Sequence, residues 1–384
     1  MIYLDHAATT KPSQAAIDAF NRSIGSFGNP SSLHQMGIDA EKEITLARQS
    51  IAGIIGASPK EICFTSGGTE ANNMAIFGGA KLTRGKRIIT TKAEHSSIIE
   101  PLKRLADKEG FELYFLSLNT GGRVDIEELK EALKEPTCLV SIHHVNSETG
   151  AIQDIESIGC ALKKASPHTM FHVDIAQSFC KLPIDIKKAQ IDLAATSAHK
   201  VGGFKGCGAL YIREGLSIPP IFYGGGQEGN VRSGTENVAG IAAFGAAALD
   251  FWGKCQENFD HALNLKQAFA GALEGIGDIQ INGGITSPYI LNISIRAAKP
   301  EVLLNALSAE GVYISSGSAC ASNKKQKNAN SSVLTAYGFS KDIAETAVRF
   351  SFSPDNTLDE IKEATAKLAD CVKFLRACSV SRFR

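Results

Sequence analysis

The segment "ISSGSACAS", residues 314–322, places one thiol, that of Cys320, among serine, glycine and alanine. Most cysteines lie in hydrophobic cores, where they behave as small apolar residues. The residues around Cys320 are too small and too polar to form such a core, so we predict a small-residue loop that presents a reactive cysteine. The thiolate is the nucleophilic form, and an unperturbed thiol has a pKa of about 8.5. A proton acceptor or a positive charge must therefore assist Cys320 at neutral pH.

A second group of chemically useful residues follows short apolar runs elsewhere in the chain. The pair Gly67–Gly68 comes after "CFTS", His95 after "RIITT", Asp174 after "TMFHV", and Lys200 after "IDLAATS". Taken singly, these residues have ordinary explanations as a tight turn, a hydrogen-bonded histidine and a solvated lysine. Taken together, they offer a helix start for a phosphate, a flat ring, a carboxylate and an amine. That set suits pyridoxal 5'-phosphate (PLP), which needs a lysine for its Schiff base and an acid beside its ring nitrogen.

The elements that must position these residues alternate between apolar runs and helical patterns from about residue 40 to residue 215. Strands are expected at residues 61–66, 87–91, 111–118, 137–145, 169–176, 191–198 and 208–213. Helices are expected at 99–110, ending at Gly110, at 125–135, capped by Asp125, and at 238–252. This alternation predicts an α/β fold with a mostly parallel sheet covered by helices on both faces. Ligands of such sheets bind beyond the carboxyl ends of the strands, where the residues above are found.

Composition narrows the class of protein. The 384 residues include 40 Lys and Arg and 40 Asp and Glu, so no net charge draws the chain to nucleic acid or to an anionic membrane. The first residues show no signal-peptide pattern, and the longest apolar stretch is too short to span a bilayer. The nine cysteines form no CxxC pair, which argues against a disulfide framework and against a zinc site. We expect a cytoplasmic enzyme that holds no metal, whose cysteines are reduced and mostly buried.

Motifs along essentially the whole chain resemble those of one family. They include "YLDHAATT", "FGNPSSLH", "FTSGGTEANN", "HVNSETG", "HVDIAQS", "SAHKVGGFKGCGALYIR", "GGGQEGNVRSGTEN", "SSGSACAS" and "VRFSFS". In this order they resemble the cysteine desulfurases, fold-type I PLP enzymes of the class-V aminotransferase family. The nitrogen-fixation and iron–sulfur-cluster assembly type is the nearest match. The form "SSGSAC", with a longer loop after it, resembles group I rather than group II of these enzymes.

The resemblance implies a seven-stranded sheet in a large PLP-binding domain at residues 16–255. It also implies a smaller α+β domain at 256–384, which carries the Cys320 loop, and an N-terminal arm, residues 1–15, that joins the small domain. It assigns catalytic roles to Cys320, Lys200, which would form the Schiff base, and His95, which would stack on the ring and transfer protons. The residues implied in cofactor binding are Gly68, Thr69, His95, Asn146, Asp174, Gln177, Ser197, His199, Lys200 and Thr235.

Individual roles within that set also follow from the resemblance. Asp174 would pair with the ring nitrogen and Gln177 with the ring hydroxyl, while Gly68, Thr69, Ser197 and His199 would hold the phosphate. Thr235 would reach the phosphate of a neighbouring subunit, because the family forms homodimers. The residues implied in substrate binding are Arg349, for the carboxylate, Asn29, at the entrance, and Asn146, beside the ring.

The implied reaction removes sulfur from L-cysteine. The thiol of Cys320 would attack the substrate sulfur and become a persulfide, L-alanine would leave, and the loop would deliver the sulfur to an acceptor protein. His95 is the candidate acceptor of the Cys320 proton. The acceptor protein would be an iron–sulfur scaffold or a relay for tRNA thiolation, and the sequence does not distinguish these. We expect no direct contact with nucleic acid or membrane.

Some features leave other readings open. Phe204 and Ser353 stand where the family usually has proline and glycine, and the stretch after Cys320 is rich in lysine, at positions 324, 325 and 327. Selenocysteine lyases, kynureninase-like lyases and aminotransferases use the same scaffold, although an aminotransferase needs no loop thiol. A further alternative is a catalytically inactive homologue that acts only as a structural partner in cluster assembly. The presence of every expected catalytic residue disfavours it: Lys200, Asp174, His95 and Cys320.

Overall fold

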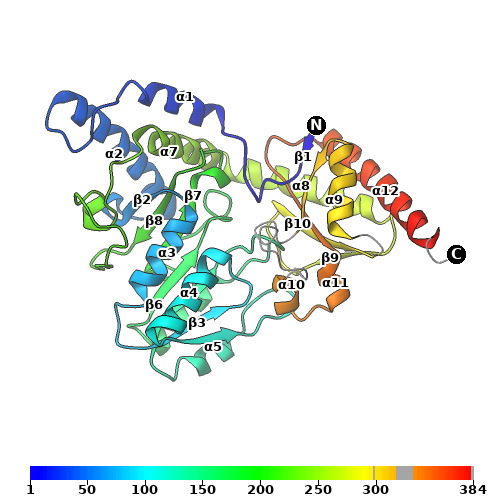
Figure 1. Ribbon diagram of the computed structural model, residues 1–384, viewed down its shortest axis with the longest axis horizontal. Helices are drawn as coiled ribbons and strands as arrows, with labels where there is room; N and C mark the ends of the chain where they lie inside the picture. Colours follow the sequence, from blue (N-terminus) through cyan, green and yellow to red (C-terminus); the bar gives the residue numbers. More distant parts are fainter. Residues whose placement is uncertain (297–298, 317–331, 382–384) are drawn as a thin grey trace.

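The computed structural model describes residues 1–296, 299–316 and 332–381 of the chain (Figure 1). Cys320 and the three lysines at 324, 325 and 327 lie outside the described residues. Two units are visible side by side, a larger one built on a wide sheet and a smaller one that contains both chain ends (Figure 1).

The larger unit is built on a seven-stranded mixed sheet, as predicted. All strands run in one direction except β8, which is antiparallel to both of its neighbours. In spatial order the strands are β2 (Ile62–Thr65), β8 (Gly208–Ile212), β7 (Leu193–Ser197), β6 (Met170–Asp174), β5 (Thr137–His143), β3 (Arg87–Thr91) and β4 (Glu112–Leu116). Each lies within a range predicted from the sequence. Residues along β5, β6 and β7 are all buried, which is the pattern of strands covered on both faces.

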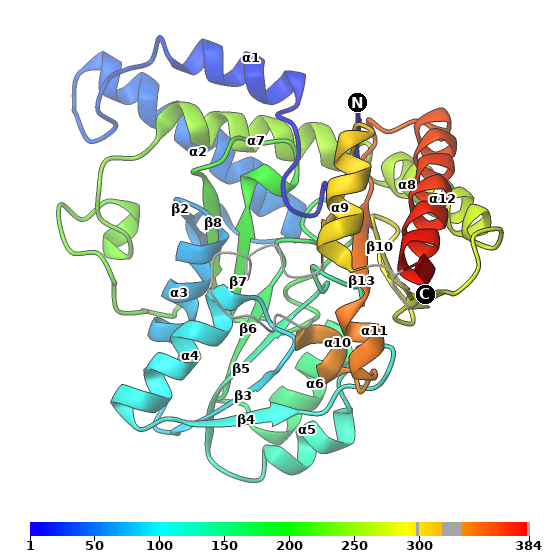
Figure 2. The same cartoon turned by 45° about the vertical axis from the view of Figure 1, so that its right-hand side comes forward.

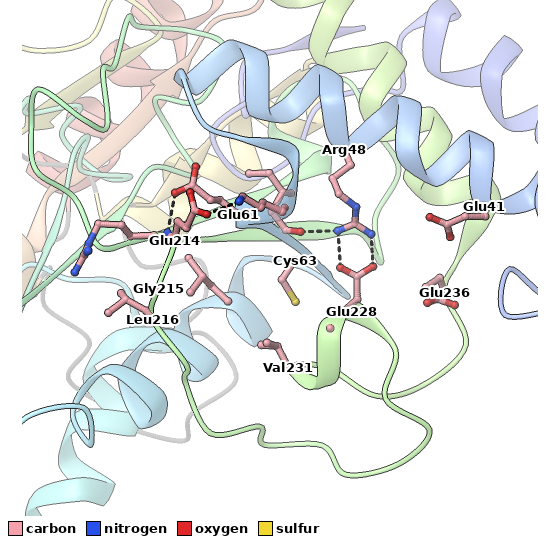
Figure 3. A pocket seen from close by; sticks show the side chains of 15 residues that line it. Glu41, Arg48, Glu61, Cys63, Glu214, Gly215, Leu216, Glu228, Val231 and Glu236 are labelled. Carbon is pink, nitrogen blue, oxygen red and sulfur yellow. Dashed lines mark hydrogen bonds and ion pairs between the residues drawn. The ribbon is translucent and has the colours of Figure 1, made fainter.

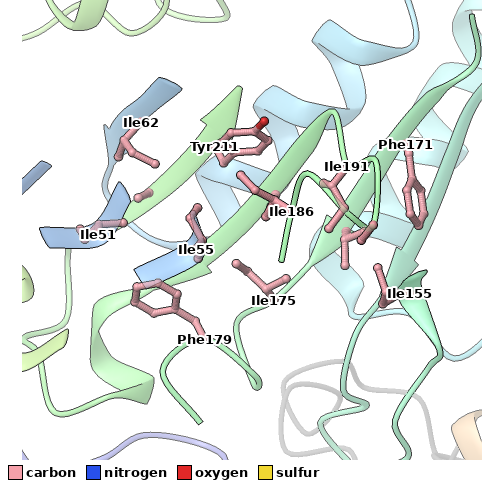
Figure 4. Packing of buried hydrophobic residues seen from close by; sticks show 14 of the residues in the cluster. Ile51, Ile55, Ile62, Ile155, Phe171, Ile175, Phe179, Ile186, Ile191 and Tyr211 are labelled. Atoms are coloured by element: carbon pink, nitrogen blue, oxygen red, sulfur yellow. The ribbon is translucent and has the colours of Figure 1, made fainter. Parts of the chain in front are cut away.

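Helices cover both faces of this sheet, also as predicted. On one face, α3 (Gly68–Gly79) and α4 (Ser96–Glu109) pack through Ile76, Ile98 and Leu102. The helices of the other face are α2 (Gln35–Ile55), α5 (Ile126–Ala132), α6 (Ile155–Ala165) and α7 (Val238–Gly253). Figure 4 shows how Ile51 and Ile55 of α2 meet the strand residues Ile62 and Tyr211. The short helix α1 (Gln14–Ser23) packs on α7.

Local sequence signals account for several helix ends. Asp125 caps α5 by accepting hydrogen bonds from the backbone N–H groups of residues 127 and 128. Gly110 ends α4 with φ of 69°, a left-handed conformation that glycine adopts without steric cost. Both caps were predicted from the sequence. Among the described residues, no single helix has the length and apolar character to cross a bilayer, and the bent pair of α7 and the next helix passes only as a combined candidate.

The smaller unit is an antiparallel sheet backed by helices. Its strands, in spatial order, are β12 (Ser315–Ser316), β13 (Ala347–Ser351), β10 (Ile290–Ile295) and β9 (Ile279–Asn282). Its helices are α8 (Cys255–Leu273), α9 (Pro300–Ala309), α10 (Ser332–Ala336), α11 (Lys341–Glu345) and α12 (Leu358–Ser381). The N-terminal strand β1 (Ile2–Tyr3) pairs in parallel with β11 (Val312–Tyr313), and Ile2 and Leu4 are buried in this unit's core. The chain then crosses to the larger sheet, which brings residues 5–10 to the strand ends.

Candidate active site

The predicted phosphate cradle lies at the start of α3, directly after β2. Gly67 is the N-cap and has no side chain to occupy the N–H groups of the first turn. A Cβ on Gly208 would lie 2.7 Å from the backbone of Gly67, so β8 approaches the cradle too closely for any larger residue there. A Cβ on Gly68 would lie 3.5 Å from the Cβ of Ser197, which places Ser197 beside the cradle. Thr69 is exposed in the same turn. Open N–H donors at the positive end of a 12-residue helix fit a phosphate group.

Lys200 and His199 leave the end of β7 on the short helix η2 (Ala198–Lys200). The Lys200 ammonium donates to the carbonyl oxygens of Ala7 at 2.5 Å and Ala8 at 2.9 Å. His199 contacts Thr9 through Nδ1 and Oγ1 at 3.1 Å. Burial lowers the pKa of His199 to about 4, and the positive charge of Lys200 adds to this effect. At neutral pH, therefore, His199 is a neutral hydrogen-bonding group under the N-terminal arm.

Asp174 and Gln177 lie at the end of β6 and in the turn that follows. The two carboxylate oxygens of Asp174 accept hydrogen bonds from the Ala176 N–H and the Asn72 amide, each at 2.9 Å. Gln177 donates through Nε2 to the carbonyl of Ala7 at 2.9 Å. Its Oε1 is buried and has no hydrogen-bond partner among the residues described. This unsatisfied acceptor fits a ligand hydroxyl group, which is the role that the resemblance implies for Gln177.

His95 begins α4 as its N-cap, just beyond β3. Its Nδ1 accepts a hydrogen bond from the backbone N–H of Ser97 at 3.1 Å and lies 2.7 Å from the Ser97 hydroxyl. The ring is exposed at the strand ends, whereas Ser97 is buried beneath it. The helix start therefore orients His95, a relation that the sequence did not reveal.

Asn146 is buried just beyond β5, and its amide is committed to the local backbone. Nδ2 donates to the carbonyl of Ala93 at 3.0 Å, and Oδ1 accepts from the N–H groups of Glu148 and Thr149 at 2.9 and 3.0 Å. These bonds tie the turn after β5 to the segment before His95. Asn146 therefore fixes the position of these two backbone segments, and both ends of its amide are used in doing so.

Arg349 faces the larger unit from β13 of the smaller one. The residue is 4% exposed, and its guanidinium donates to Asp5 Oδ1 at 2.6 Å and to the carbonyl of Ser147 at 2.8 Å. Its Nε is buried without a hydrogen-bond partner in the part of the chain that the structure describes. A carboxylate already contacts this guanidinium, which still has donors to offer. Both features fit the recognition of a carboxylate by a rigid fork of donors.

Two residues implied by the resemblance lie elsewhere in this protomer. Asn29 is exposed in the connection between α1 and α2, where its Oδ1 accepts from the Ser31 N–H at 2.9 Å. Thr235 is exposed in the long connection from β8 to α7, which projects from the side of the larger unit (Figure 2). The structure thus gathers the predicted residues of the strand ends and Arg349, but leaves Asn29 and Thr235 apart from them.

Sequence reasoning missed a buried pair close to this site. His143, the last residue of β5, contacts Glu94 through Nδ1 and Oε1 at 2.8 Å, and Thr91 donates to the same oxygen at 2.7 Å. Burial alone would lower the pKa of His143, but the charge of Glu94 and their hydrogen bond outweigh burial and raise it. His143 is also the direct strand neighbour of Asp174. The sequence signal for this pair was the double histidine in "SIHHV", because two histidines are unusual within a strand that was predicted to be buried.

A cavity of about 510 Å³ lies away from the strand-end residues, beside β2 (Figure 3). Its wall contains an ion pair in which Glu228 accepts from both terminal nitrogens of Arg48, at 2.7 and 2.8 Å, and from the Phe64 N–H at 2.8 Å. Glu228, Gly229 and Asn230 all have positive φ values, between 48° and 65°. The ion pair therefore anchors a strained turn in the connection that carries Thr235.

Glu228→Gln should destabilise the protein strongly, because it leaves the guanidinium of Arg48 buried without its counter-ion. The Glu228 side chain is 2% exposed and that of Arg48 is 19% exposed. Removing one partner of a buried ion pair lowers the free energy of unfolding by about 3–5 kcal/mol. Urea denaturation measures this change. The control is Glu214→Gln, whose ion pair with Lys60 is exposed on both sides and should contribute almost nothing. Equal stability of the two variants would show that the Arg48–Glu228 pair does not hold the turn.

Comparisons with known proteins define the class to which this fold and site belong. The class-V aminotransferase family model matches residues 2–363. The chain is 38% identical to the cysteine desulfurase IscS of Vibrio atlanticus over 390 residues, which cover 98% of this chain and 94% of the relative. The chain therefore belongs to the class-V aminotransferase family, and its relatives there are PLP-dependent cysteine desulfurases.

Solved structures agree with this assignment. A NifS-like protein superimposes with a TM-score of 0.91 at 34% identity, covering 97% of this chain and 99% of that one. The structure described as SspA in complex with cysteine superimposes with a TM-score of 0.81 at 33% identity, covering 93% of this chain and all of that one. The predictions of a fold-type I enzyme, of its family and of its cofactor are confirmed.

Proposed function

We propose that this protein is a cysteine desulfurase that takes sulfur from L-cysteine, releases L-alanine and carries the sulfur as a persulfide on Cys320. The observation that supports this most is the meeting of Lys200, Asp174 and the α3 cradle at one sheet edge, with Arg349 facing them from the second unit. Selenocysteine lyase activity is the nearest alternative, and selenide release compared with sulfide release by the purified protein distinguishes the two.

Different residues of the chain would bind different parts of the cofactor. The first turn of α3, Ser197 and His199 would hold the phosphate, Asp174 the protonated ring nitrogen, and the unsatisfied Oε1 of Gln177 the ring hydroxyl. When bound, PLP supplies a carbonyl that reacts with amines and a ring that withdraws electrons from the substrate carbons. The amine of Lys200 would hold the cofactor covalently and would serve as a proton carrier at the same site.

Arg349 would bind the carboxylate of L-cysteine and so hold the substrate next to β13. Ser315 of β12 is the strand partner of Arg349, so the segment that leads to Cys320 begins beside the substrate clamp. Cys320 follows Ser316 by four positions in the sequence, and four residues extend over at most about 14 Å.

The sulfur transfer balances without an added oxidant. The Cys320 thiolate attacks the substrate sulfur, an S–S bond forms and the C–S bond of the substrate breaks. The electron pair of that bond stays on carbon, which takes up a proton and becomes the methyl group of L-alanine. A thiol of the acceptor protein then attacks the outer sulfur, the S–S bond to Cys320 breaks, and Cys320 leaves as a thiolate.

Two other thiols near the strand ends are less suited than Cys320 to act as the nucleophile. Cys180 and Cys207 are each 1% exposed. Burial raises the pKa of Cys207 to about 12, and it raises the pKa of Cys180 well above its ordinary value. Neither side chain forms a thiolate at neutral pH, so neither is suited to attack sulfur.

Arg349→Ala should raise the KM for L-cysteine by about tenfold to a hundredfold, because each hydrogen bond to a charged group contributes roughly 1.5–3 kcal/mol. Cofactor content, measured by absorbance, should not change. Arg349→Lys should restore binding only in part, because an ammonium lacks the planar fork. The control is Asp5→Asn, which removes the carboxylate now bound to Arg349 and should not raise KM. An unchanged KM in Arg349→Ala would remove Arg349 from the substrate site.

We also propose a homodimer in which Thr235 completes the cofactor site of the neighbouring subunit. Exposed apolar side chains occur along the two connections that carry Asn29 and Thr235. They are Ile24, Phe27 and Leu33 on the first, followed by Met36 and Ile38 at the start of α2, and Phe222 and Tyr223 on the second. Contiguous exposed apolar surface is typical of protein–protein interfaces. The Arg48–Glu228 pair ties the second connection to α2, the helix that follows the first connection.

The dimer is tested by sedimentation, and Leu33→Glu is expected to yield monomers with low activity. Leu33 is 96% exposed, so the substitution should not disturb the fold of a single chain. The matched control is Phe374→Glu on α12, which is 65% exposed on the smaller unit and should remain dimeric. A fully active wild-type monomer would rule out the proposed role of Thr235.

Several narrower assignments complete the proposal. We divide the chain into an arm (1–15), a large domain (16–255) and a small domain (256–384), because the helices α7 and α8 meet at Lys254. The sulfur acceptor would be an iron–sulfur scaffold or a tRNA-thiolation relay in the cytoplasm. Identification of proteins that accept labelled sulfur from the enzyme would distinguish these two classes.

A further inference from the structure

A chain of hydrogen bonds runs from Asp174 to His95 beneath the sheet edge. Asn72 Nδ2 lies 2.9 Å from Asp174 Oδ2 and 2.8 Å from the Ser97 hydroxyl oxygen. That hydroxyl oxygen lies 2.7 Å from His95 Nδ1. Asn72 and Ser97 are 2% and 6% exposed, so the two residues that join the ends of this chain are shielded from water.

The orientation of the Asn72 amide follows from its neighbours. Its NH2 group has two hydrogens, and the two contacts of Nδ2 use both of them. The opposite orientation would place the Asn72 carbonyl oxygen against the Asp174 carboxylate, two acceptors with no hydrogen between them. Asp174 therefore fixes Asn72 as the donor to Ser97.

The direction of the remaining bond follows in the same way. The Ser97 oxygen accepts a hydrogen from Asn72 and still has its own hydrogen to donate to His95 Nδ1. The backbone N–H of Ser97 donates to the same nitrogen at 3.1 Å. Nδ1 of His95 thus faces two donors and must keep its lone pair, and the proton of the neutral ring is then on Nε2. A proton on Nδ1 would point at the Ser97 N–H, at the positive end of α4.

We propose that Ser97 and Asn72 are positioning residues that hold His95 in the tautomer with its proton on Nε2, with Asp174 setting the direction of the bonds. The proposal deepens the proposed function, because it gives His95 its chemical role at that site. In this tautomer Nε2 presents an N–H and no lone pair, so neutral His95 is a hydrogen-bond donor to an anion and not a base. The sequence predicted that His95 accepts the Cys320 proton. With the hydrogen bonds described here, we expect His95 to donate to a thiolate or a carboxylate instead.

The test is 15N NMR of the holoenzyme labelled with 15N-histidine, with the His95 signals identified by their loss in His95→Gln. The nitrogen shifts report which atom carries the proton, independently of turnover. We expect a protonated Nε2 and an unprotonated Nδ1 in the wild type. Ser97→Ala removes one of the two donors and should raise the ratio of the Nδ1–H form to the Nε2–H form about fivefold, the effect of a typical hydrogen bond. The two nitrogen shifts should therefore approach each other.

Ser97→Thr is the matched control, because it keeps the hydroxyl and should keep the wild-type shifts. A wild-type enzyme with its proton on Nδ1 would overturn the proposal, even if Ser97→Ala failed to fold. Identical shifts in wild type, Ser97→Ala and Ser97→Thr would overturn the role of the Ser97 hydroxyl. Failure of the proposed function is recognised separately, since an enzyme that releases no L-alanine can still show the expected tautomer.

Discussion

Cys320→Ser is expected to abolish desulfuration while leaving the fold and the cofactor intact. A serine hydroxyl is a far poorer nucleophile toward sulfur than a thiolate. Turnover to L-alanine should fall about 10⁴-fold or more, the scale seen when a nucleophile is removed from other enzymes. L-Cysteine should still bind and change the cofactor absorbance, because Lys200 and Arg349 remain. Rates of L-alanine formation and absorbance spectra measure both parts of this prediction.

The matched control for Cys320→Ser is Cys160→Ser. Cys160 is an exposed thiol on α6, so its replacement changes a solvent-accessible cysteine without touching the strand ends. Its activity should equal that of the wild type. If Cys320→Ser retained wild-type turnover, the protein would not be a persulfide-forming desulfurase, and another reaction of the class-V family would have to be considered.

Lys200→Ala should remove the covalent attachment of the cofactor and, with it, almost all turnover. The expected loss is again about 10⁴-fold or more, because one side chain holds the cofactor and moves protons. Borohydride reduction of the wild type followed by peptide mapping should place the cofactor on Lys200. Lys205→Ala is the matched control, since Lys205 is an exposed lysine five residues further along the chain. Cofactor attached to any lysine other than Lys200 would contradict the assignment.

Much of the larger unit could be predicted because its signals are local. Each strand of the central sheet reads as a short apolar run, and caps such as Asp125 and Gly110 mark helix ends through single side-chain or φ requirements. Because ligands bind beyond the carboxyl ends of parallel strands, the sequence alone was enough to group His95, Asp174 and Lys200. The family motifs added Arg349, which no local rule linked to the larger sheet.

What the sequence did not reveal depends on contacts between distant residues. Asp5 meets Arg349 and Ala7 meets Lys200 only because β1 pairs with β11 in the smaller unit and returns the chain to the strand ends. Asn72 and Ser97 lie 25 residues apart and meet across α3 and α4. In the sequence, "EANN" and "HSSI" are ordinary polar stretches at helix starts. Their function depends on which donor faces which acceptor, and only the three-dimensional arrangement fixes that.

The central claim, that Cys320 carries the sulfur, is tested most directly by mass spectrometry of the wild-type enzyme after a short pulse of L-cysteine. The peptide that contains Cys320 should gain the mass of one sulfur atom, and a thiol reductant should remove it. Peptides that contain Cys180 or Cys207, both buried near the strand ends, should stay unmodified. Added sulfur on either of those cysteines, with none on Cys320, would contradict the account.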